Sequence, residues 1–316
     1  MGALDYDLIV SFYTTLSTVG KVVIEKTPEG SVKTRVGLSR RTVRYAHTIL
    51  TQALQEAKKR NLITSVPTQE YKFTKVKASE KTHNKWVVLD RDQLAEFLSD
   101  CRGHRDYSLI YTAAYTGARE SELLGLTWDR VLWDIPAIKI NYTLHYNEKK
   151  FEFRPATKND SSNRIIKITD RTVKVLKALK AEQEEKGIKA NHVFIIGRKK
   201  ITPDFVFLEP NGGLIKRDNL VHRFSNLSER LGYPGMTFHH LRHTHATILL
   251  SEGVYINDVS ERLGHANVAT TMNIYAHTLP GKDTKVADIF DKLISDDDNN
   301  TFSEDNNDNF PKDDDE

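Results

Sequence analysis

The ten-residue stretch TFHHLRHTHA (Thr237–Ala246) holds four of the chain's twelve histidines and an arginine. His239 and Arg242 stand three residues apart, so on a helix both project from one face near its start. The free N–H groups at a helix start also attract anions. A histidine, an arginine and these amides together favour a binding site for a phosphate group.

A metal site is the competing interpretation of the same stretch. His239 and His243 have the four-residue spacing of two zinc ligands in HExxH, but position 240 holds His instead of the required Glu. The sequence has no CxxC, and Arg242 would place a fixed positive charge beside a dication. We therefore expect no metal ion, and we interpret His243 and His245 as hydrogen-bonded structural imidazoles.

Three other stretches carry residues of similar chemistry. They are TGARESELLGLTW with Arg119 and Glu122, TKNDSSNRIIKI with Lys158, and LGHANVATTMNIYAHT with His265 and Tyr275. Together with the histidine-rich stretch, and in this order, they resemble the motifs of tyrosine recombinases. The resemblance is to integrases of phages and of conjugative transposons from Gram-positive bacteria, and it covers residues 5–295.

The resemblance implies a nucleophile and an acid. Tyr275 would attack the scissile phosphate of DNA, which leaves a 3′-phosphotyrosine and a free 5′-hydroxyl. Ionising a tyrosine with a pKa of about 10 at pH 7 costs roughly 4 kcal/mol, so a nearby base and a cationic site must offset this cost. Lys158, expected at a hairpin tip, would be the general acid for the 5′-oxygen.

The remaining motif residues would form the phosphate-binding set. Arg119 and Arg242 would bind non-bridging oxygens, and His265 would donate a hydrogen bond to the same phosphate. His239 would either accept the tyrosine proton or hold the phosphate. Glu122 would orient an arginine, unless it is an ordinary surface glutamate. Because arginine and lysine supply the positive charge, we expect no metal, no ATP and no other cofactor.

The implied function is site-specific DNA recombination, which proceeds through a Holliday junction and integrates or excises a mobile element. Alternatives are a Xer-like recombinase that resolves chromosome dimers and a non-catalytic DNA-binding relative. The expected partners are double-stranded recombination sites, a homotetramer on DNA, and accessory DNA-bending or excision factors. Many integrases of this group carry a further N-terminal arm-binding domain, and the sequence leaves open whether one was removed from this chain.

Two helices, over residues 5–18 and from an N-cap at Ser39 to Arg60, would bind the core site. The second helix has a polar face that suits DNA phosphates and base edges, although a plain solvated face has the same composition. We also expect two lysines of the following segment to lie along DNA. The candidate DNA-binding residues are Arg40, Arg41, Arg44, Thr48, Thr51, Lys75 and Lys77. Residues 25–37 between the helices, with Pro and Gly, predict a loop.

Periodicity predicts an α+β fold that is mainly helical. A small N-terminal helical core-binding domain (1–65) and a linker (66–86) precede a mixed catalytic domain (87–295) with a small antiparallel sheet. Residues 282–294 predict an amphipathic helix that docks on its own domain or, in the tetramer, on a neighbouring copy. Residues 296–316 predict a disordered acidic tail.

Composition agrees with a nucleic-acid partner. The net charge is +3, but the acidic tail carries −9, so the other 295 residues carry +12. No apolar run has the length of a membrane span and no signal peptide starts the chain, so we expect no membrane partner. The single cysteine argues for a reducing compartment, which for this function is the bacterial cytoplasm at the nucleoid.

Overall fold

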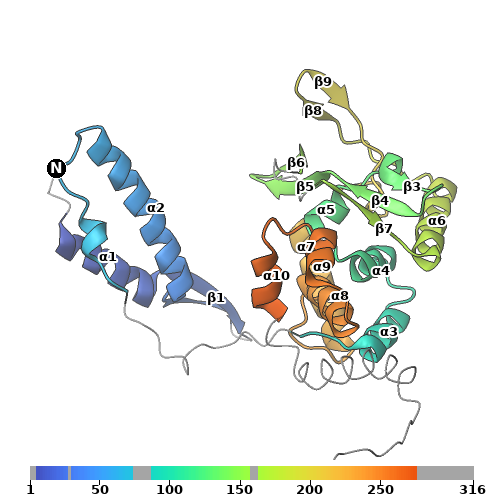
Figure 1. The fold of residues 1–316 in the computed structure, drawn as a ribbon, viewed down its shortest axis with the longest axis horizontal. Coiled ribbons are helices and arrows are strands. Elements are labelled where there is room, and N and C mark those ends of the chain that lie inside the picture. Colours follow the sequence, from blue (N-terminus) through green and yellow to red (C-terminus); the bar gives the residue numbers. More distant parts are fainter. Residues whose placement is uncertain (1–4, 28–29, 74–86, 157–162, 276–316) are drawn as a thin grey trace, which may run out of the picture. The chain divides into compact units, whose positions relative to one another are not determined.

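The computed structural model describes residues 5–27, 30–73, 87–156 and 163–275 (Figure 1). The chain forms two compact units, Met1–Asn84 and Lys85–Glu316. None of the helices in the described ranges is long and apolar enough to cross a membrane. The expected helix of residues 282–294 and the acidic tail lie outside these ranges.

The described residues of the first unit form two α-helices, a two-stranded hairpin and a 3-10 helix. Its elements are α1 (Tyr6–Val19), β1 (Lys21–Thr27), β2 (Gly30–Val36), α2 (Arg40–Lys59) and the 3-10 helix η1 (Pro67–Glu70). Asp5 and Ser39 cap the two helices by accepting hydrogen bonds from backbone N–H groups, as the Ser39 prediction requires. The core consists of Ile9, Tyr13 and Val43.

Two expectations for this unit are wrong. Residues 25–37 do not form a loop, because β1 and β2 pair antiparallel over most of this stretch. The expected linker of residues 66–86 does not start at residue 66, since η1 follows and Tyr71 and Phe73 pack on the core. The rings of Tyr71 and Phe73 meet edge to face with their centroids 5.0 Å apart. Residues 74–86 lie outside the described ranges.

The second unit is mainly helical, with small antiparallel sheets. Its helices are α3 (Arg91–Asp100), α4 (Tyr107–Thr116), α5 (Glu120–Leu124), η3 (Trp128–Arg130), α6 (Asp170–Glu185), α7 (Arg217–Arg230), α8 (Phe238–Ser251), α9 (Ile256–Leu263) and α10 (Val268–Tyr275). Its strands are β3 (Val131–Leu132), β4 (Ala137–Ile140), β5 (Tyr142–Asn147), β6 (Lys150–Pro155), β7 (Arg164–Lys167), β8 (Phe194–Ile196) and β9 (Lys199–Ile201). Asp90 and Gln93 form a capping box at the start of α3.

The strands form one three-stranded sheet in the order β3-β4-β7 and two separate hairpins, β5-β6 and β8-β9. In the sheet, Ile138 pairs with Ile166 and both side chains are buried. Strand β6 pairs with β5 and β7 pairs with β4. Lys158 is expected at a hairpin tip. It falls in the connection between β6 and β7, within residues 157–162, which the structure does not describe.

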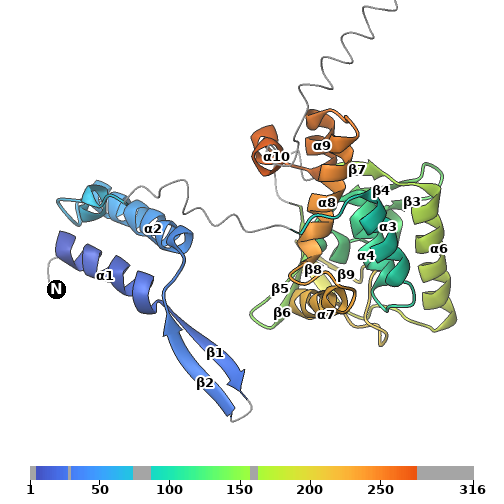
Figure 2. The same cartoon turned by 90° about the horizontal axis from the view of Figure 1, so that it is seen from below.

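The helices place two chain reversals close together. Helix α8 packs on both α4 and α9, as Figures 1 and 2 show. Helix α4 ends at Gly117 and α9 ends at Gly264, each in the left-handed conformation that favours glycine. Arg119 follows the first reversal and His265 follows the second. A Cβ on Gly117 would lie 2.7 Å from carbon atoms of His245 and Leu263, so the two reversals are closely packed.

We predict that Gly117→Ala destabilises the second unit by about 2–4 kcal/mol, because strain at positive φ adds to overpacking. Gly187→Ala is the matched control, since Gly187 has φ +64° against +63° for Gly117 and no atom within 4 Å of its Cβ position. Urea unfolding followed by tryptophan fluorescence measures the difference, since all three tryptophans follow residue 84. Equal losses in the two variants would show that close packing at Gly117 contributes nothing.

Candidate active site

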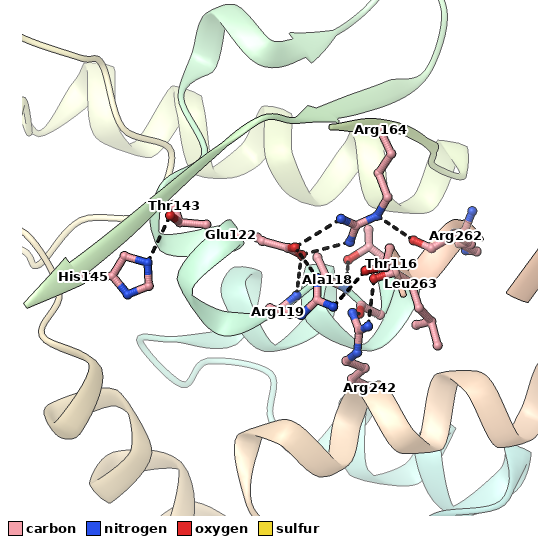
Figure 3. A network of polar contacts seen from close by, with 12 residues as sticks. Thr116, Ala118, Arg119, Glu122, Thr143, His145, Arg164, Arg242, Arg262 and Leu263 are labelled. Carbon is pink, nitrogen blue, oxygen red and sulfur yellow. Dashed lines mark hydrogen bonds and ion pairs between the residues drawn. The ribbon is translucent and has the colours of Figure 1, made fainter. Parts of the chain in front are cut away.

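The carboxylate of Glu122 lies at the centre of a buried polar network (Figure 3). Its Oε1 accepts hydrogen bonds from the guanidinium groups of Arg119 (2.7 Å) and Arg164 (3.1 Å). Its Oε2 accepts from the backbone N–H of Arg119 (2.8 Å) and again from Arg164 (2.9 Å). Burial raises the pKa of Glu122, but the hydrogen bonds and charges of Arg164 and Arg119 outweigh this, and the pKa lies below its ordinary value.

The two arginines of the expected phosphate-binding set both bind the end of helix α9. Arg242 is 3% exposed and donates to the carbonyls of Gly117 (2.7 Å) and Leu263 (2.8 Å). Arg119 donates to the carbonyl of Gly264 at 2.8 Å, and its side chain is 36% exposed. The contacts to adjacent carbonyls bring the two guanidinium groups to one helix end, and together they form a cationic site that is exposed at Arg119 and buried at Arg242.

His265 and His239 belong to the same charged environment. His265 directly follows Gly264, and its Nδ1 is hydrogen-bonded to Thr271 Oγ1 at 2.7 Å. Burial and the nearby Arg242 lower the pKa of His265 to about 4, and the same causes lower the pKa of His239 to about 4. The His239 side chain is exposed, so water screens part of this effect. Both imidazoles are therefore neutral at pH 7, and a neutral imidazole can accept a proton.

The other histidines of the stretch have structural contacts. The ring of His243 meets that of His239 edge to face, with the centroids 4.7 Å apart. His245 donates from Nδ1 to the carbonyl of Ala114 (2.9 Å), so its Nε2 accepts the 3.0 Å hydrogen bond from Arg262. His240 accepts a hydrogen bond from the backbone N–H of Thr237 at 3.2 Å and so caps α8.

Tyr275 is the last residue of α10, a helix that begins three residues after His265 and packs on α9. Its side chain and Lys158 lie outside what the structure describes. Among the described residues, no three His, Cys, Asp or Glu side chains form a group that could hold a metal ion.

The candidate DNA-binding residues of α2 differ in their surroundings. Arg41 and Thr48 are exposed. Arg44 is also exposed, and its guanidinium stacks over the ring of Phe73. Thr51 faces its own unit instead, because its hydroxyl donates to the buried Thr68 hydroxyl at 2.9 Å. Two nitrogen atoms of the Arg40 side chain are buried. Lys75 and Lys77 lie outside the described ranges.

Sequence reasoning gave no role to two arginines that the structure places in this network. Arg164 is 7% exposed and binds Glu122. Arg262 binds His245 and the carbonyl of Tyr115 (3.0 Å). Arg164 stands in the quoted TKNDSSNRIIKI stretch, but its partner is 42 residues away, so the sequence carries no local signal for the contact.

We predict that the second unit loses stability as the pH falls from about 6.5 to about 5.5. Burial lowers the pKa of both His243 and His245 to about 3 in the folded chain, whereas the unfolded chain takes up these protons near pH 6.5. Each such histidine lowers the unfolding free energy by up to about 1.4 kcal/mol per pH unit in this window. Urea unfolding with tryptophan fluorescence measures the slope, which should be smaller in His245→Gln. A slope of zero in the parent chain would contradict the assignment of these histidines as neutral.

Comparison with known proteins identifies the family of this chain. The family model described as "Phage integrase family" matches residues 87–281. A tyrosine recombinase XerC-like protein of Caldanaerobacter subterraneus subsp. tengcongensis is 30% identical over 224 residues, 68% of this chain and 56% of that protein. The ICEBs1 integrase of Bacillus subtilis is 28% identical over 194 residues, 60% of this chain and 49% of that protein. The chain thus spans about half the length of these relatives.

A solved structure shares the fold. The Tn1549 transposon integrase, in complex with a circular intermediate DNA, superposes with a TM-score of 0.67 at 24% identity. The match covers 81% of this chain and 80% of that one. The family match covers the whole stretch from Arg119 to Tyr275 that carries the sequence motifs. The chain therefore belongs to the phage integrase family of tyrosine recombinases.

Proposed function

We propose that the chain is a site-specific DNA recombinase that integrates or excises a mobile element. It cuts each strand by forming a 3′-phosphotyrosine at Tyr275 and rejoins strands through a Holliday junction. The observation that carries the proposal is the placement of Arg119 and Arg242 on adjacent carbonyls, directly before His265 and the helix that ends at Tyr275.

This site suits a pentacovalent phosphate. Two guanidinium groups provide planar, permanently charged donors for non-bridging oxygens, and such preorganised donors are worth most where charge develops in the transition state. The one carboxylate in the network, Glu122, is already neutralised by Arg119 and Arg164. It therefore repels an incoming phosphate little, while it holds Arg119 by both its backbone and its side chain.

We assign the two proton transfers to His239 and Lys158. His239 is neutral at pH 7, which suits a proton acceptor for Tyr275, although it can equally hold the phosphate as a donor. His265 donates to a phosphate oxygen. Lys158 serves as the acid for the leaving 5′-oxygen, because the connection between β6 and β7 ends at Arg164, next to Glu122. No metal or nucleotide cofactor has a part in this scheme.

The expected tetramer has a candidate docking site for residues 282–294. A cavity of about 800 Å³ lies between α3, α4, α8 and α9, and most of its lining surface is apolar. Its apolar lining includes Leu94, Leu98, Tyr115, Ile248, Leu249 and Val254. The spacing of Val286, Ile289, Phe290 and Leu293 gives an apolar stripe that would fill it from a neighbouring copy. Accessory DNA-bending factors complete the proposed assembly.

Relatives support a mobile element more than chromosome-dimer resolution. They include the ICEBs1 integrase and the Tn1549 integrase, whose structure holds a circular intermediate DNA. A XerC-like relative is compatible with the alternative. The first unit would contact the core site through Arg41, Arg44 and Thr48 on α2, with Lys75 and Lys77 along the phosphate backbone. The protein would then act in the bacterial cytoplasm, on nucleoid DNA.

We predict that the chain forms a covalent adduct with a nicked suicide duplex spanning the joined ends of the DNA element that carries its gene. Tyr275→Phe should abolish the adduct without weakening DNA binding, because only the nucleophile is lost. Tyr255→Phe is the matched control, since Tyr255 is exposed at the start of α9. Denaturing gel electrophoresis detects the adduct, and persistence of the adduct in Tyr275→Phe would overturn the nucleophile assignment.

We predict that a chain ending at residue 281 still binds its site but no longer assembles four protomers on two duplexes. A chain ending at residue 295 is the control, because it lacks only the acidic tail. Ala95→Arg should reproduce the defect of the shorter chain, since Ala95 is an exposed residue of the cavity lining. Sedimentation of the DNA complexes measures assembly, and tetramers of the shorter chain would exclude exchange of this segment.

A further inference from the structure

The last carbonyls of helix α9 are held by three arginines from three different elements (Figure 3). Arg164 Nε donates to the carbonyl of Arg262 at 2.7 Å. Arg242 donates to the next carbonyl, that of Leu263, and Arg119 to the one after, that of Gly264. Three consecutive backbone acceptors at one helix end are therefore each paired with a guanidinium group.

This arrangement has a clear physical cause. The last carbonyls of a helix have no partner within the helix, and they form the negative end of its dipole. Cations placed there are stabilised, and they in turn fix the direction in which the chain leaves the helix. Here the chain leaves through Gly264 to His265, whose backbone N–H donates to the carbonyl of Ser260 at 3.0 Å. The three arginines thus hold the backbone that carries His265.

Arg164 differs from the other two arginines in its surroundings. Its side chain is 7% exposed, whereas that of Arg119 is 36% exposed. All three of its nitrogen atoms donate within the protein, Nε to Arg262 and the other two to Glu122. Glu122 in turn accepts two hydrogen bonds from Arg119. Arg164 therefore has no nitrogen left to bind the phosphate. It connects Glu122, the carboxylate that holds Arg119, with the end of helix α9 directly before His265.

We propose that Arg164 is a positioning residue for the recombination reaction. It sets the distance between Arg119 and His265 by bridging Glu122 and the carbonyl of Arg262. This inference rests on the proposed function, because it assigns the role through the phosphate that Arg119 and His265 would bind. Lysine cannot replace this bridge, since it lacks the planar fork that binds both carboxylate oxygens while a third nitrogen binds the carbonyl.

The test compares Arg164→Met and Arg164→Lys with a matched control, Arg223→Met. Arg223 also forms a two-point ion pair with a buried carboxylate, that of Asp106 (2.8 and 3.0 Å). Its side chain also binds Glu209, and neither of these two partners belongs to the proposed site. The single-turnover rate of adduct formation at saturating nicked duplex should fall about 100-fold in both Arg164 variants, since small misplacements cost about this much. DNA affinity should stay the same, and Arg223→Met should keep the rate of the parent chain.

A double-mutant cycle asks whether Arg164 acts through Glu122. If it does, Arg164→Met combined with Glu122→Gln should lower the rate no more than the more damaging single change. Independent, additive losses would overturn the bridging role. An Arg164→Lys rate equal to that of the parent chain would also overturn it, because the charge alone would then suffice.

A spectroscopic readout keeps the inference separate from the proposed function. In histidine side-chain NMR spectra of the DNA-free chain, the His265 signals should shift in both Arg164 variants and stay in place in Arg223→Met. Unchanged His265 signals in a folded Arg164→Lys chain would overturn the inference whatever the activity. The opposite outcome would contradict the proposed function instead. In that case the Arg164 variants would show these His265 shifts, but the parent chain would form no adduct with any joined-end duplex.

Discussion

The arrangement of the site depends on one buried carboxylate. Glu122 is 2% exposed, a burial that a single charged carboxyl does not tolerate without partners. Four hydrogen bonds from two arginines satisfy its lone pairs and neutralise its charge. Removing one partner would leave an uncompensated charge in the interior, which is far more costly than the net contribution of the pair. The network therefore exists as a unit.

Helix ends supply the rest of the site. Gly117 and Gly264 each reverse the chain in the left-handed conformation, and their close packing brings the start of the α5 segment against the end of α9. Arg242 joins the two reversals because it donates to a carbonyl of each. The same backbone groups that a helix end leaves without partners thus hold the arginines that are proposed to bind phosphate. Helix α8, which carries Arg242, packs against both α4 and α9.

Local signals predicted much of the fold. The N-cap of α2 at Ser39 is as expected, because a serine directly before a helical pattern is a local signal. The β1-β2 hairpin escaped prediction, since Val22, Ile24 and Val32 are all exposed and give no alternation of buried and polar residues. Contacts between distant residues, such as that of Arg164 with Glu122, have no local signal in the sequence. The family resemblance assigned roles to Arg119, Glu122 and the other motif residues, but none to Arg164.

A structure of Tyr275→Phe bound to the nicked duplex tests the proposed phosphate site most directly. Arg119 and Arg242 should both lie within about 3.2 Å of non-bridging oxygens of one phosphate. They should keep their hydrogen bonds to Gly264 and Leu263, and His265 should contact the same phosphate. A scissile phosphate bound elsewhere, or arginines that must leave the carbonyls of α9 to reach it, would contradict the assignment of this site.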